Sequence, residues 1–75
     1  MLATYEIKVF RNVGDNHRHD REYTFFIKKY TEHSNNIGDA KDEALKKAKS
    51  LNYDEDFNYC TYNADLESVN IQYNR

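Results

Sequence analysis

The chain has few of the residues that mark disulfide-linked, zinc-binding or phosphate-cradling proteins. Of its 75 residues one is cysteine, two are glycine, and none is proline or tryptophan. The single cysteine, Cys60, can form no internal disulfide and supplies no zinc-type cysteine pair. The two glycines make no phosphate-binding loop, and no nucleophile elbow or other catalytic signature occurs. The sequence therefore predicts neither an enzyme nor a protein that needs a cofactor.

Long apolar runs are also missing. No stretch approaches the roughly 18 residues of a membrane helix, and the first residues lack a signal-peptide pattern. We therefore expect a cytoplasmic protein with no membrane partner. Thirteen acidic against eleven basic residues leave a net charge of −2. That balance works against non-specific nucleic-acid binding, which depends on uncompensated Lys and Arg, and it is far too small for mimicry of nucleic-acid phosphates.

Aromatic side chains are what the chain has in quantity. Seven tyrosines and four phenylalanines can each bury about 150–250 Å², so a short polar chain can still fold. A chain of this length hides only about 60% of its unfolded surface. We therefore expect one compact domain over residues 1–75, with a thin core that favours binding over catalysis.

Alternation and helical spacing divide the chain into elements. Residues 4–11 and 21–30 alternate as half-buried strands and predict a hairpin with a long polar tip. Helical spacing over 39–51 predicts an amphipathic helix whose buried face holds Ile37, three alanines and Leu51, with Asp39 as its N-cap.

The remainder of the chain alternates again. Residues 57–63 and 67–73 predict two more strands, joined by a turn at 64–66. The predicted fold is α+β with the order β-β-α-β-β, in which one helix packs on one face of a small antiparallel sheet. Val69 and Ile71 are expected under the helix.

The segment VGDNHRHDRE, residues 13–22, raises a metal and a phosphate hypothesis. His17, His19 and Asp20 could belong to a metal site, but zinc needs three or four converging ligands. Arginines and histidines could grip phosphate, but the acidic residues of the segment interrupt the positive charge. The preferred interpretation is a solvated hairpin tip, with no metal site.

The aromatic residues outnumber the places in such a core. Some must therefore lie on the second face of the sheet or at its ends, where exposed aromatics serve as anchors of protein interfaces. They could also stack unpaired bases, or two sheets could pack face to face in a homodimer. The predicted anchors are Tyr30, Tyr59 and Tyr62. The predicted steering charges, which act mainly on the rate of encounter, are Arg18, Arg21, Asp54 and Asp56.

Four stretches of the chain resemble one class of proteins at the level of architecture. ATYEIKVF, REYTFFIKKY, DAKDEALKKAKSL and ESVNIQY are similar to the pattern of small bacteriophage inhibitors, which include anti-CRISPR proteins and a coliphage inhibitor of bacterial RNA polymerase. The resemblance implies a short helix on a small sheet, and a stoichiometric binder that blocks a host complex. It carries no residue-level motif.

Two functional hypotheses follow. The first is a non-enzymatic protein-binding module, a phage-encoded inhibitor of a host defence or transcription complex that acts in the host cytoplasm and contacts a protein or nucleoprotein partner. The second is a small nucleic-acid-binding domain that uses a basic hairpin tip and a tyrosine-rich sheet face.

Overall fold

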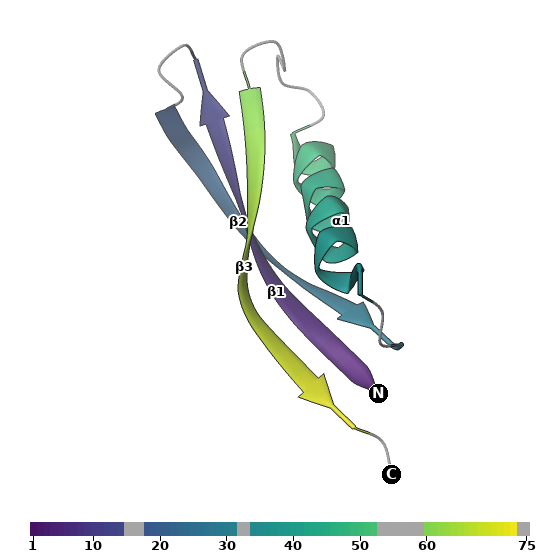
Figure 1. Ribbon diagram of the computed structural model, residues 1–75. Helices are drawn as coiled ribbons and strands as arrows, with labels where there is room; N and C mark the ends of the chain where they lie inside the picture. The colour runs from purple at the N-terminus through teal and green to yellow at the C-terminus, as the bar shows by residue number, and fades with distance from the viewer. Residues whose placement is uncertain (15–17, 32–33, 53–59, 74–75) are drawn as a thin grey trace.

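The computed structural model describes four stretches of the chain. These are residues 1–14, 18–31, 34–52 and 60–73. Within them the chain forms three strands and one helix (Figure 1): β1 (Leu2–Val13), β2 (Arg18–Lys29), α1 (Asn36–Leu51) and β3 (Cys60–Gln72). The fold is α+β, as predicted.

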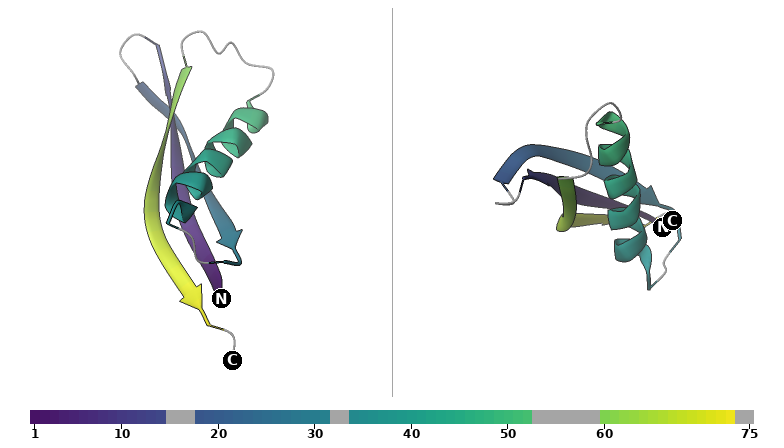
Figure 2. Two further views of the ribbon diagram at one scale, coloured as in Figure 1. Left: turned by 45° about the vertical axis from the view of Figure 1, so that its right-hand side comes forward. Right: turned by 90° about the horizontal axis from the view of Figure 1, so that it is seen from above.

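The sheet has the order β2-β1-β3, and β1 pairs antiparallel with both neighbours. The helix lies across one side of the three strands and leaves the other side without a covering element in the described part of the chain (Figure 2). The strands are 12, 12 and 13 residues long, about twice the usual length. The radius of gyration is accordingly 14.1 Å, against about 11 Å for a compact chain of this size.

Alternation along β1 creates the core. Ala3, Tyr5, Ile7 and Val9 point toward the helix and are buried, because successive side chains of a strand face opposite sides of the sheet. The helix meets them with Ala40, Ala44 and Ala48, all completely buried. Small side chains let the helix backbone lie close to bulky strand residues, so the predicted alanine face is confirmed.

The helix begins earlier than predicted. Asn35 is the N-cap in place of Asp39, whose N–H donates a 2.9 Å hydrogen bond to the Asn35 carbonyl. The side-chain amide of Asn36 donates to the carbonyl of Thr31 at 2.8 Å, which ties the first helical residue to the end of β2. Ile37 and Leu51, expected on the buried face, are exposed, whereas Asn36 and Asn52 occupy the buried positions four residues before Ala40 and four residues after Ala48.

The prediction of two strands after the helix is wrong for the described residues. A single strand, β3, runs through residues 64–66. Its register with β1 shifts between Ile7, which faces Leu66, and Glu6, which faces Ser68, so Glu67 is an extra residue in a β-bulge. A bulge reverses the phase of alternation without ending the strand, and this phase change imitates a turn in the sequence.

The hairpin tip is shorter than predicted. β2 begins at Arg18, three residues before the predicted start, so residues 18–20 of the expected tip belong to the strand. A second bulge makes this possible: Arg11 faces Arg21 while Asn12 faces His19, which leaves Asp20 as the extra residue. No helix in the described residues is long and apolar enough to cross a membrane.

Candidate interaction surfaces

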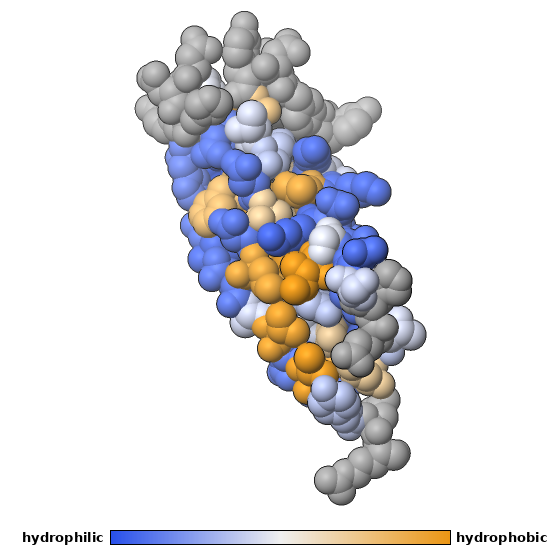
Figure 3. Space-filling view, in the orientation of Figure 1, coloured by the Kyte–Doolittle hydropathy of each residue, from blue (hydrophilic) through white to orange (hydrophobic). Residues whose placement is uncertain are grey.

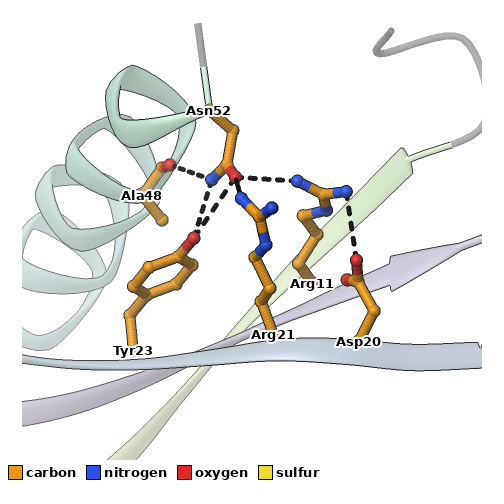
Figure 4. A network of polar contacts seen from close by, with 6 residues as sticks. All are labelled: Arg11, Asp20, Arg21, Tyr23, Ala48 and Asn52. Atoms are coloured by element: carbon orange, nitrogen blue, oxygen red, sulfur yellow. Dashed lines mark hydrogen bonds and ion pairs between the residues drawn. The ribbon is translucent and has the colours of Figure 1, made fainter. Parts of the chain in front are cut away.

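A polar network closes the end of α1 onto the sheet (Figure 4). The side-chain oxygen Oδ1 of Asn52, the residue after the helix, accepts hydrogen bonds from Arg11 Nη1 at 2.7 Å, from Arg21 Nη1, and from the Tyr23 hydroxyl at 3.2 Å. Its amide nitrogen Nδ2 donates to the Ala48 carbonyl at 2.7 Å. Cations near a helix C-terminus also interact favourably with the helix dipole. The network therefore fixes the helix end.

Arg11 is held from a second direction. Its Nη2 lies 3.1 Å from Oδ2 of Asp20, the residue that the β2 bulge sets out of register. The guanidinium is buried while the carboxylate keeps partial contact with solvent. A buried charge needs such a partner, and the bulge places Asp20 where it pairs with Arg11.

Tyr62 lies beside this network on the helix side of the sheet. It faces Arg11 across the β1–β3 ladder, and Lys49 Nζ lies 5.8 Å from its ring centroid. The hydroxyl is buried and has no hydrogen-bond partner among the described residues. Burial raises the pKa of the Tyr62 phenol, and the positive charge of Arg11 offsets this only in part. Tyr62 is thus half-buried, with its polar end turned inward.

The other predicted interface residues are spread over the molecule. Tyr30 directly follows β2 and is exposed. Arg18 is the first residue of β2, and Arg21 belongs to the Asn52 network. Asp54, Asp56 and Tyr59 lie outside the described residues, as does His17. The structure therefore places Arg21 and Tyr62 together on the helix side, and Tyr30 elsewhere.

The uncovered side of the sheet is mostly polar, and we call it the open sheet face. Its members are Thr4, Glu6, Lys8 and Phe10 of β1, Glu22, Thr24, Phe26 and Lys28 of β2, and Asn63, Asp65, Ser68 and Asn70 of β3. Phe26 is 61% exposed, whereas Phe10 is half-buried and meets the ring of His19 edge-on, with centroids 4.9 Å apart. Phe26 is thus the most exposed large apolar side chain of this face in the described strands.

Charged and polar pairs surround the two phenylalanines. Lys8 Nζ lies 3.0 Å from the carboxylate of Glu22, and the Ser68 hydroxyl donates a 2.8 Å hydrogen bond to Glu6. The hydrogen bond to Glu22, together with the nearby charges of Glu22, Glu67 and Glu6, raises the pKa of Lys8. Lys8 is therefore a stable cation rather than a nucleophile or a base.

A second surface lies on the helix side, along the last part of β3. We call it the aliphatic strip; its members are Ile37, Leu45, Leu66, Val69 and Ile71. Val69 and Ile71 point to the helix side but are 40% and 45% exposed, because the end of β3 extends past the start of α1 (Figure 1). Figure 3 shows apolar side chains gathered over β3 and α1. The prediction that the helix covers Val69 and Ile71 is wrong.

In the described part of the chain, no group of three or more His, Cys, Asp or Glu side chains could hold a metal ion. Comparisons of the chain with protein-family models, with curated proteins and with solved structures found no match.

The Asn52 network was not predicted from the sequence. Three signals were present: an asparagine directly after a helical pattern, which often ends a helix, an arginine at an inward position of β1, and another at an inward position of β2. An inward-facing arginine in a strand needs a buried acceptor. No local pattern identifies which residue supplies it.

Proposed function

We propose that the chain is a non-enzymatic protein-binding module that presents its open sheet face to a partner. The observation that carries this proposal is the exposed Phe26 on a face that no described element covers. An antiparallel sheet commonly leaves one side in water, but that side is then polar. An aromatic residue within a polar surround has instead the composition of an interface anchor and its rim.

The neighbours of Phe26 support an interface of this kind. Glu6 faces it on β1, and Thr24 and Lys28 flank it on β2. Tyr30, which follows the end of β2, is also exposed. A protein partner can bury the two aromatic rings while the surrounding polar groups retain water or pair across the rim.

We further propose that the partner is a larger host complex, and that binding inhibits it by occupying a surface. This specific role is supported by the resemblance of the sequence to phage inhibitors of host defence and transcription complexes. The domain is small, and the Asn52 network fixes the end of its helix to the sheet. A rigid scaffold loses little conformational entropy when it binds.

Binding of nucleic acid is the second candidate function, and the placement of side chains argues against it. Arg11 and Arg21 direct their guanidinium groups to Asn52 on the helix side, away from the open sheet face. Tyr5, Tyr23 and Tyr62 also lie on the helix side. The open sheet face carries three acidic and two basic residues: Glu6, Glu22, Asp65, Lys8 and Lys28. Such a face attracts phosphates weakly.

A capture experiment with two matched variants tests the proposal. Phe26→Ser and Leu51→Ser each remove a large apolar side chain of similar exposure, 61% and 63%, from opposite sides of the sheet. Both purified proteins are checked for unchanged circular dichroism. Captured partners are identified from host lysate, and affinity for the purified partner is measured by calorimetry. Phe26→Ser should weaken binding about tenfold or more, equivalent to about 1.4 kcal/mol, and Leu51→Ser should not.

Full retention of affinity in Phe26→Ser would contradict the assignment of the open sheet face. The nucleic-acid alternative is checked in parallel by titration with DNA and RNA at increasing salt. Binding with a steep decline of log affinity against log salt concentration, and no protein partner, would favour that alternative.

A further inference from the structure

The two edges of the sheet differ in how they are protected. An edge strand exposes unpaired backbone N–H and C=O groups, and proteins usually guard such an edge with charged residues, proline or bulges. In β2, six of the twelve residues are charged. β3 carries Asp65 and Glu67 near its middle, but its last part, Ser68–Gln72, contains no charged residue and no proline. Among the described residues β3 pairs only with β1, so this uncharged edge is open.

The aliphatic strip reaches the sheet edge at the same place. Val69 and Ile71 belong to the uncharged part of β3 and remain 40% and 45% exposed on the helix side. Ile37 at the start of α1 is also exposed, and Leu45 and Leu66 are half-buried against the core. Figure 3 shows apolar side chains gathered on this face, with hydrophilic side chains between some of them. An open edge and an exposed apolar surface thus coincide.

We propose that two copies of this chain associate through the β3 edges, pairing antiparallel about a two-fold axis at Asn70. In that register Val69 of one copy faces Ile71 of the other, Ser68 faces Gln72, and Asn70 faces its own equivalent. The axis is perpendicular to the sheet, so both helices lie on the same side of one six-stranded sheet. The two aliphatic strips then meet between the helices and cover each other.

The distribution of charge favours a second copy paired through this uncharged segment. A two-fold interface places the same surface patch on both sides, so the patch must be complementary to itself. The segment Ser68–Gln72 satisfies this condition because it has no charge to repel its equivalent. Pairing centred on Leu66 would set Asp65 directly opposite Glu67, and like charges in that position are destabilising. Pairing of β3 with β2 of another copy would form an open-ended chain and would involve the charged edge.

The dimer extends the proposed function without depending on it. The open sheet faces of the two copies lie on the side opposite the helices and form one surface with two Phe26 anchors. The β3 contact itself uses neither Phe26 nor Tyr30. The contact involves only the last residues of β3, so dimer formation should depend on protein concentration.

A charge-exchange experiment tests both the contact and its register. Sedimentation equilibrium should give a mass that rises with concentration from 9.0 kDa toward twice that value. Val69→Lys and Ile71→Glu should each lose the dimer, because each places a lone charge opposite an aliphatic side chain. An equimolar mixture of the two variants should recover it, because Lys at position 69 of one copy then faces Glu at position 71 of the other. Thr24→Lys, on β2, is the control and should dimerise like the wild type.

A cross-linking measurement keeps the test valid if a charged variant folds poorly. In a Cys60→Ser background, Asn70→Cys should form an intermolecular disulfide on oxidation, because directly paired residues of antiparallel strands have suitable Cα separations. Asn63→Cys on the same face should not. A wild-type chain that stays monomeric at all concentrations, a mixture that fails to re-associate although both variants are folded, or equal cross-linking at positions 63 and 70 would each overturn the proposal. A chain that stays monomeric but binds an added peptide of unrelated sequence along the β3 edge would also overturn the proposal, and would indicate a foreign partner at this edge.

Discussion

Arg11 on the central strand donates a 2.7 Å hydrogen bond to the side-chain oxygen of Asn52, 41 residues further along the chain. The two residues are only 6% and 1% exposed. The bond joins the middle strand of the sheet to the end of the helix, and it belongs to a network in which the amide of Asn52 both accepts and donates. The network thus adds a polar connection between helix and sheet to the apolar packing of the core.

The network predicts that Asn52→Ala is strongly destabilising. The substitution removes the acceptor of two guanidinium groups and the donor to the Ala48 carbonyl. A buried polar group that loses its partner costs about 1–3 kcal/mol, so we expect the free energy of unfolding to fall by about 2–3 kcal/mol. Urea unfolding measures it. Asn63→Ala, an exposed asparagine on β3, is the control. Equal stability of the two variants would show that the network contributes little.

Burial predicts that the Arg11–Asp20 ion pair stabilises the fold more than the Lys29–Glu43 ion pair. Asp20→Ala leaves the buried Arg11 guanidinium without its carboxylate at 3.1 Å, and we expect a loss of about 1–3 kcal/mol. The contact between Lys29 and Glu43 is shorter, 2.8 Å, but more exposed, and exposed pairs contribute little.

Glu43→Gln should therefore leave the denaturation midpoint unchanged within error. Chemical unfolding at low and high salt checks both variants. A loss in Glu43→Gln as large as that in Asp20→Ala would contradict the ranking by burial.

Much of the fold could be predicted because its signals are local. The spacing of Ala40, Ala44 and Ala48 specifies the buried face of the helix, and alternation specifies β1 and most of β2. The phase change at Glu67 could not be interpreted from the sequence. A turn and a bulge produce the same break in alternation, and only the pairing with β1 distinguishes them.

The candidate surfaces were harder to predict for the same reason. Val69 and Ile71 have the alternation of buried residues, but their cover depends on where the helix lies across the sheet, which is a property of the tertiary structure. In the sequence, Tyr62 and Phe26 both belong to the aromatic residues that exceed the places in the core. Which of them is exposed follows from the register of β3 and β2 with β1.

Tyr62 predicts a dependence of stability on alkaline pH. Burial raises the pKa of its phenol in the folded state, whereas the unfolded phenol has a pKa of about 10. Below the unfolded value, both states are neutral and the contribution of Tyr62 to stability is fully present. As the pH rises from the unfolded pKa through the folded pKa, the unfolded state loses its proton first, and this contribution is lost.

Tyr62→Phe should therefore lose less stability than the wild type as the pH rises above about 10. At neutral pH the variant should be as stable as the wild type or more stable by up to about 1 kcal/mol, because the buried hydroxyl has no hydrogen-bond partner among the described residues. Thermal unfolding across this pH range measures both effects. The two proteins differ in no other ionisable group, so the difference between the curves reports on Tyr62. Parallel curves would show that the phenol is not buried in solution.

The two glycines predict opposite effects of the same substitution. A Cβ would meet no atom within 4 Å at either Gly14 or Gly38, so neither change causes a clash. Gly14 has φ of 78°, a conformation that costs an L-residue about 1–2 kcal/mol, and Gly14→Ala should lower the free energy of unfolding by that amount. Gly38 lies inside α1, where alanine loses less backbone entropy on folding, and Gly38→Ala should raise the free energy of unfolding by about 0.4–1 kcal/mol.

Since the added atom is the same and the space is open at both positions, backbone conformation alone accounts for the difference in sign. Asparagine tolerates positive φ better than alanine, so Gly14→Asn should fall between Gly14→Ala and the wild type in urea unfolding. A Gly14→Ala variant as stable as Gly38→Ala would show that the turn at the end of β1 relaxes to negative φ.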